Sequence, residues 1–184
     1  MFRFAVLAAL LFALPAGAEP PAGYKLVWSD EFDAGPLPDP AKWAYDTEAN
    51  ASGWYNNELQ YYAVARVENS RVAKGKLTIT ARKESLTSAP DYGGQAYTSA
   101  RLITRGLFTF THGFVEVRAK LPCGQGLWPA IWMLGAKGAW PKGGEIDIME
   151  HINAEGVVYG TVHNQSTAGT SGVGGTLPLP DACT

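Results

Sequence analysis

Residues 145–150 read Glu-Ile-Asp-Ile-Met-Glu and place three carboxylates within six positions. Successive side chains of a β-strand point to opposite faces, so Glu145 and Asp147 share one face while Glu150 has the wrong parity to join them. One extra residue accommodated at positions 148–149 as a β-bulge would return Glu150 to that face, and bulges often lie beside active sites. We therefore predict a bulged strand with three carboxylates on one surface.

Carboxylates in such a group can cleave glycosidic bonds. One attacks the sugar, while a second, held protonated by its surroundings, delivers a proton to the leaving oxygen. Like charges push each other's pKa values apart, so one member can stay protonated near neutral pH, and Asp147 is placed between its two neighbours to have this effect. The alternative is a solvated edge strand with acidic residues on its wet side, which the motif by itself leaves open.

Length and composition indicate one globular domain. The chain has 184 residues, a net charge of -2, 46% hydrophobic residues and 21 glycines, so no basic surface for a nucleic-acid partner is expected. Six tryptophans and eight tyrosines suit a large sandwich core or stacking on flat ligand faces. We expect a monomer.

The first 18 residues predict a secretory signal peptide. Arg3 precedes an apolar run over residues 4–14, and a small-residue ending follows. The run is shorter than the roughly 20 residues that span a bilayer, so we expect a secreted or periplasmic protein without membrane association after cleavage. Export permits a disulfide between the two cysteines, Cys123 and Cys183, with two free thiols as the open alternative.

Beyond residue 23 the sequence consists of short alternating runs separated by turn residues. This pattern predicts an all-β fold, an antiparallel sandwich or barrel, in one domain over residues 19–184. Loops are expected at residues 85–95 and 166–180. Besides the carboxylate segment, strands are expected over residues 26–28, 42–45, 77–82, 99–104, 107–110, 113–121, 128–134 and 157–163.

Four blocks resemble glycoside hydrolase family 16, and within it the bacterial laminarinase-like endo-β-1,3-glucanases. They are residues 28–32, 54–62, 124–133 and 144–150. The resemblance implies a concanavalin-like jelly-roll sandwich with a concave substrate cleft. It also implies a retaining reaction with Glu145 as nucleophile, Glu150 as general acid/base and Asp147 as the residue that tunes their ionisation. Met149 is the inserted residue that distinguishes laminarinase-like members from mixed-linkage lichenases, and we expect it to be the bulge residue.

Further residues receive roles from the same resemblance. Trp128 and Trp132 would stack on glucosyl rings, with core packing as the alternative. His163 would line the cleft next to Glu150. Hydrogen bonds to sugar hydroxyls would come from Asn57, Glu58 and Arg101, for which ordinary turn or rim polarity is the alternative.

No cofactor is implied for catalysis, but many relatives hold a structural calcium, for which Glu31 and Gly75 match the ligand positions. Family domains usually continue for some fifty residues beyond the last loop seen here, so we expect residues 1–184 to be a C-terminally incomplete part of a longer protein.

The substrate partner implied by the resemblance is a β-glucan polysaccharide, laminarin in particular. Mixed-linkage β-1,3-1,4-glucan and galactans such as agarose remain open, because a few hydroxyl contacts in loops decide between them. Transglycosylation is a further outcome of the same chemistry. A catalytically inactive lectin-like sandwich is the alternative from another class.

Overall fold

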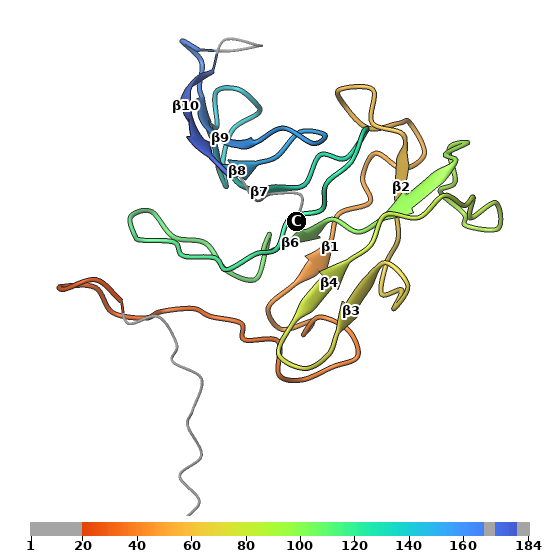
Figure 1. Ribbon diagram of the computed structural model, residues 1–184, viewed down its shortest axis with the longest axis horizontal. Coiled ribbons are helices and arrows are strands. Elements are labelled where there is room, and N and C mark those ends of the chain that lie inside the picture. Colours follow the sequence, from red (N-terminus) through yellow and green to blue (C-terminus); the bar gives the residue numbers. More distant parts are fainter. Residues whose placement is uncertain (1–19, 168–171, 180–184) are drawn as a thin grey trace, which may run out of the picture. The chain divides into compact units, whose positions relative to one another are not determined.

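The computed structural model describes residues 20–167 and 172–179, and that part of the chain is built from strands (Figure 1). It contains no helix long and apolar enough to cross a membrane. The strands are β1 (Ala44–Tyr45), β2 (Gln60–Tyr62), β3 (Ser70–Val72), β4 (Leu77–Ile79), β5 (Tyr97–Ser99), β6 (Leu102–Ile103), β7 (Ala130–Leu134), β8 (Glu145–Glu150), β9 (Val157–His163) and β10 (Val173–Pro178).

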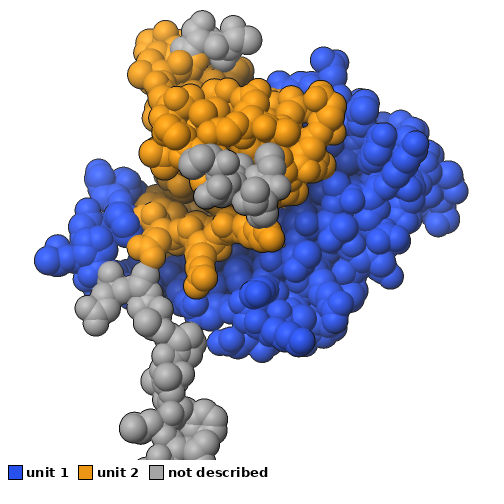
Figure 2. Space-filling model, viewed as in Figure 1, with its two compact units in different colours: residues 1–101, 111–114 blue, residues 102–110, 115–184 orange. Residues whose placement is uncertain are grey.

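The chain divides into two compact units, which Figure 2 colours separately. The first comprises residues 1–101 and 111–114, and the second comprises residues 102–110 and 115–184. In the first unit β3 and β4 pair antiparallel, whereas β2 and β5 form a short parallel pair. The second unit contains a four-stranded antiparallel sheet in the order β10-β9-β8-β7.

The first unit is organised around the fully buried side chain of Asn50. Its amide nitrogen donates to the Tyr62 carbonyl and to Asp91, at 3.0 and 2.9 Å. Its amide oxygen accepts from the Trp54 indole and from the Tyr62 backbone N–H, both at 3.0 Å. Because both ends of the amide are satisfied, this polar group can be buried without a large desolvation cost.

The sheet of the second unit carries the carboxylate segment on β8, between β7 and β9 (Figure 1). Val162 on β9 pairs with Ile146 on one side and with Val173 of β10 on the other. These three apolar side chains therefore lie on one face of the sheet, because directly paired residues project to the same side. The face that carries Asp147 is the opposite one.

Several expected strands agree with the structure in position, and β9 agrees in both bounds. Three expectations are wrong. No strand is formed at residues 26–28, 107–110 or 113–121. Every residue from 111 to 120 is exposed, so alternation there does not reflect burial against a sheet.

The stretch 166–180, expected to be loop, contains β10. Its glycines make a strand hard to predict from the sequence, but they allow close pairing with β9. A Cβ at Gly174 would lie 2.2 Å from the Gly160 carbonyl oxygen of β9, so the two backbones approach more closely than an alanine would permit.

Candidate active site

Strand β8 contains a β-bulge between Asp147 and Glu150, at the position predicted from the alternation of its side chains. On the β9 side Asp147 pairs with Thr161 and Glu150 pairs with Tyr159, so two residues of β8 lie opposite the single residue Gly160. On the β7 side Ile131 pairs with Met149 and Trp132 pairs with Asp147. Ile148 is therefore the extra residue opposite β7, where Met149 is paired, so the expectation that Met149 is the bulge residue is wrong. The bulge itself is confirmed.

The bulge places Glu150 on the same face of β8 as Glu145 and Asp147. Asp147 is 5% exposed, and its burial raises the pKa of its carboxyl to about 7, with the charges of Glu145 and Glu150 and a hydrogen bond to Glu145 as further causes. A residue on the opposite face of the strand could not form this bond. Near neutral pH a large fraction of Asp147 is therefore protonated and can donate to Glu145.

Each outer glutamate also accepts a hydrogen bond from an indole. Trp128 Nε1 donates to Glu150 Oε1 over 2.9 Å. Trp140 Nε1 donates to Glu145 Oε2. Indole N–H is a donor only, so each glutamate is the acceptor in its contact and neither indole adds another titrating group. Trp140 was not among the residues expected from the sequence.

His163 lies beside the trio but not where we expected it. It pairs with Glu145 across the β8–β9 ladder, and its Nε2 is 3.3 Å from Asp147 Oδ2. The neighbour of Glu150 on β9 is Tyr159, so the expectation that His163 adjoins Glu150 is wrong. His163 lowers the pKa of Asp147, which partly opposes the larger effect of burial.

Trp132 lies on the carboxylate face of the sheet. It is the direct β7 partner of Asp147, and paired residues in antiparallel strands project to the same side. Trp128 lies just before β7 and is 46% exposed, so its ring face is accessible while its N–H is bound. Both tryptophans predicted for sugar stacking thus belong to the same surface as the carboxylates.

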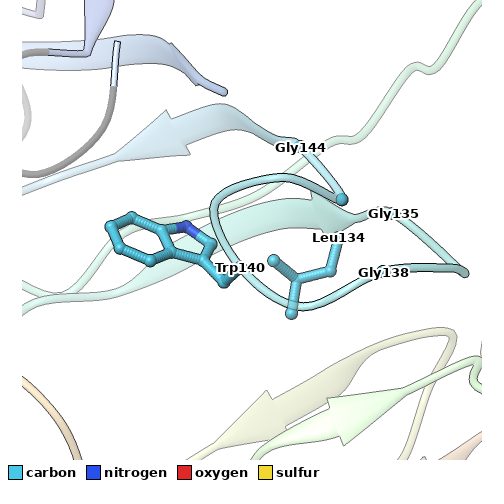
Figure 3. Close-up of a pocket in the computed structure, with 6 residues that line it drawn as sticks. Leu134, Gly135, Gly138, Trp140 and Gly144 are labelled. Carbon is cyan, nitrogen blue, oxygen red and sulfur yellow. The ribbon is translucent and has the colours of Figure 1, made fainter. Parts of the chain in front are cut away.

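The loop between β7 and β8 carries Trp140. At the base of the loop Gly135 N–H donates to the Gly144 carbonyl over 3.0 Å. A Cβ at Gly135 would lie 1.9 Å from the Gly143 carbonyl oxygen, so only glycine permits this closure. The loop encloses a pocket of about 50 Å³, and the indole of Trp140 points away from Gly138 (Figure 3).

The family profile described as "XgeA-like, catalytic GH16 domain" matches residues 44–175, which is more than half of the chain. The chain belongs to glycoside hydrolase family 16. The matched region includes the bulged strand, the loop before it and β9.

Relatives within family 16 include a beta-glucanase from Rhodothermus marinus, which is 50% identical over 169 residues. That alignment covers 88% of this chain and 56% of the relative. A solved structure of a variant of SCLam, a non-specific endo-β-1,3(4)-glucanase of the same family, is 50% identical. It matches with a TM-score of 0.86 over 91% of this chain and 68% of the SCLam chain, and it holds 1,3-β-D-cellobiosyl-glucose at its active site.

The laminarinase structure from Rhodothermus marinus matches with a TM-score of 0.78 at 51% identity, over 87% of this chain and 64% of that one. The chain thus spans between about half and two thirds of the length of these relatives. These matches give this family 16 chain the jelly-roll β-sandwich fold that the resemblance implied, and the all-β prediction is confirmed.

The three polar residues expected to contact sugar hydroxyls lie in the first unit of this family 16 chain, whereas the carboxylates lie in the second. Asn57 is exposed in a turn with a φ of 59°, a left-handed conformation that asparagine tolerates better than most residues. Arg101 is held by two groups of its own unit. Its Nε is 3.1 Å from Asp46 Oδ2, and its Cζ lies 4.8 Å from the centroid of the Trp54 ring.

Glu58 lies in a pocket of about 300 Å³ within the first unit, together with Leu59, Gly94 and Tyr97. Its carboxylate accepts hydrogen bonds from the Gln60 amide and the Tyr62 hydroxyl.

The calcium prediction finds only partial support in this family 16 chain. Gly75 lies next to Glu31, because a Cβ at Gly75 would be 3.7 Å from the Glu31 carbonyl oxygen and 3.6 Å from Asp33 Oδ1. Calcium takes six to eight oxygen ligands, and these residues supply too few of them. Among the described residues no group of three or more His, Cys, Asp or Glu side chains could hold a metal.

Cys123 is disulfide-bonded. Its expected partner, Cys183, lies outside the described residues, as does the predicted signal peptide at residues 1–18.

Proposed function

We propose that the protein is a retaining endo-glycoside hydrolase that cleaves β-1,3-glucan of the laminarin type. The observation that carries this proposal is the bulge at residues 148–149, which gathers three carboxyl groups on one face of β8 beside two tryptophans. A solvated edge strand does not fit these data, because β8 is flanked by strands on both sides and Asp147 is buried.

In the proposed first step a carboxylate oxygen of Glu145 attacks the anomeric carbon and forms a covalent glycosyl ester, while Glu150 gives its proton to the departing glycosidic oxygen. In the second step Glu150 takes a proton from water, and the hydroxide displaces Glu145 from the same carbon. Two inversions restore the original configuration. Protonated Asp147 limits the number of negative charges in the trio and donates to Glu145.

The assignment to β-1,3-glucan is supported by the relatives named as laminarinase and beta-glucanase. SCLam acts on both β-1,3 and β-1,4 linkages by its description, so mixed-linkage glucan is the second candidate substrate. The three retained carboxyl groups argue against an inactive lectin-like sandwich, because a binding site alone has no need to bury a carboxyl between two others.

The experiment is reducing-sugar release from laminarin, lichenan and agarose by the full-length protein, with the anomer of the first product followed by NMR. We expect release from laminarin, with the β-anomer formed first, and its loss in Glu145→Gln. The matched control is Glu116→Gln, which neutralises an exposed glutamate of the same unit.

Three outcomes of this experiment would contradict the proposal. Full activity of Glu145→Gln would remove the assigned nucleophile. An α-anomer formed first would exclude retention. Binding without release of any sugar would favour the lectin-like alternative.

Three further proposals accompany this function. Residues 1–18 are a signal peptide, and the protein acts outside the cytoplasm as a monomer on a β-glucan. Residues 19–184 belong to the catalytic domain. Calcium at Glu31 and Gly75 is a structural ligand only, and a rise in melting temperature on adding CaCl₂ that EDTA reverses would support it.

A further inference from the structure

We propose that Trp140 is a positioning residue that fixes the carboxylate of Glu145 through its indole N–H. This inference rests on the proposed hydrolase function and extends it to a residue in the loop before β8. The two residues are in direct contact, because Trp140 Nε1 donates to Glu145 Oε2.

The chemistry of the contact suits a nucleophile. A carboxylate must present one oxygen to the anomeric carbon in a fixed direction, because orientation contributes much of the rate in such reactions. An N–H bound to Oε2 fixes the orientation of the carboxylate plane. A lysine or arginine in the same place would add a positive charge, whereas indole supplies a donor without one.

The chain holds the indole in place through the backbone of its loop. Gly143 N–H donates to the Ala139 carbonyl over 2.9 Å, and Gly144 N–H donates to the Pro141 carbonyl over 3.0 Å. These bonds bracket Trp140 on both sides. Its ring also lies 6.3 Å from the ring of His163, at an interplanar angle of 49°. Figure 3 shows the indole projecting from this closed loop.

A second role for Trp140 must be separated from the first. Its side chain is 51% exposed, so its ring could also serve as a stacking surface for a sugar. Stacking requires the aromatic face alone, whereas positioning requires the N–H. A substitution that keeps the ring and removes the N–H therefore distinguishes them.

The experiment replaces Trp140 in the full-length protein with β-(3-benzothienyl)alanine, in which sulfur takes the place of N–H at nearly unchanged shape. The rate of covalent labelling of Glu145 is then measured with 2-deoxy-2-fluoro-laminaribiosyl fluoride, by mass spectrometry of the labelled peptide. We expect labelling to slow about 10- to 100-fold, the loss expected for one hydrogen bond to a charged group. The dissociation constant for laminaritriose, measured by calorimetry, should stay within about twofold of the wild-type value, because the ring face remains.

The matched control is the same replacement at Trp43, in the first unit. Trp43 Nε1 donates to Asp30 Oδ2 over 2.8 Å. The control variant therefore loses an equivalent bond, to a carboxylate that has no role in the proposed reaction. Its labelling rate should equal that of the wild type. Melting temperatures of both variants verify that each is folded.

One result would overturn the inference while leaving the proposed function intact, namely labelling of the benzothienyl variant at the wild-type rate. If labelling of Trp140→Phe is slow at the same time, Trp140 is a stacking or packing residue only. Failure of the wild-type protein to form any covalent adduct at Glu145 would instead overturn the proposed function, and this inference with it.

Discussion

His163 Nε2 lies 3.3 Å from Oδ2 of Asp147, so the most buried carboxyl of the site has a histidine as its neighbour on β9. Burial and the charges of Glu145 and Glu150 raise the pKa of Asp147 to about 7, and His163 opposes part of that rise. The folded protein therefore keeps a proton on Asp147 at pH values where an unfolded aspartate, with a pKa of about 3.9, has lost it.

This raised pKa predicts how stability depends on pH. Between about pH 4 and pH 7 the folded state binds the Asp147 proton and the unfolded state does not, so the contribution of this group to stability falls as pH rises. Asp147→Asn removes that titration. We expect the melting temperature of the variant to fall less than that of the wild type between pH 4 and pH 7, whereas exposed Asp33→Asn should follow the wild type. Parallel curves for wild type and Asp147→Asn would contradict the raised pKa.

Replacing the assigned acid should affect substrates according to their leaving groups. In Glu150→Gln no proton reaches the glycosidic oxygen, so hydrolysis of laminarin should slow by about 10²- to 10⁴-fold, the usual contribution of general acid–base catalysis. From dinitrophenyl laminaribioside the dinitrophenolate group leaves without protonation, so the first step on this substrate should be nearly unaffected in a pre-steady-state burst. Equal losses on both substrates would show that Glu150 is not the acid.

Strand parity made the carboxylate cluster predictable from the sequence. Glu145 and Asp147 share a face in any strand, and the need to bring Glu150 to that face required a bulge, which the structure contains. Parity could not say which residue would be extra, because that choice depends on the pairing with β7. The contact of Trp140 with Glu145 could not be predicted from the sequence, because it depends on how a ten-residue, glycine-rich loop closes. The signal available was a tryptophan in the loop that leads into the motif.

Strand β10, which was expected to be a loop, allows a test of stability at Gly174 in which the neighbouring Gly175 serves as the control. Gly174→Ala would place a Cβ 2.2 Å from the Gly160 carbonyl oxygen, so β9 and β10 would have to separate. We expect a loss of about 1 to 3 kcal/mol in the free energy of unfolding, as is usual for overpacking. Gly175→Ala meets no atom within 4 Å and should be neutral or slightly stabilising. Denaturant unfolding of both variants would measure the difference, and equal stabilities would contradict the close pairing.

The bulge itself can be tested by changing the length of β8. Deleting Met149 leaves Glu-Ile-Asp-Ile-Glu, in which simple alternation places all three carboxylates on one face two positions apart. The pairings of Asp147 with Thr161 and of the last glutamate with Tyr159 can both survive, because the bulge already compresses two residues opposite Gly160.

Inserting an alanine between Met149 and Glu150 has the opposite effect. If the bulge persists, the glutamate turns to the other face. If the strand straightens, the glutamate lies six positions from Glu145, about 20 Å at ~3.3 Å per residue, whereas the β9 partners of Glu145 and Glu150 are only four positions apart in the native sheet. We therefore expect the deletion to keep laminarin hydrolysis within about tenfold of the wild-type rate and the insertion to lower it by at least about 10²-fold. If both variants are folded and equally inactive, then the bulge does more than set the face of β8 on which Glu150 lies.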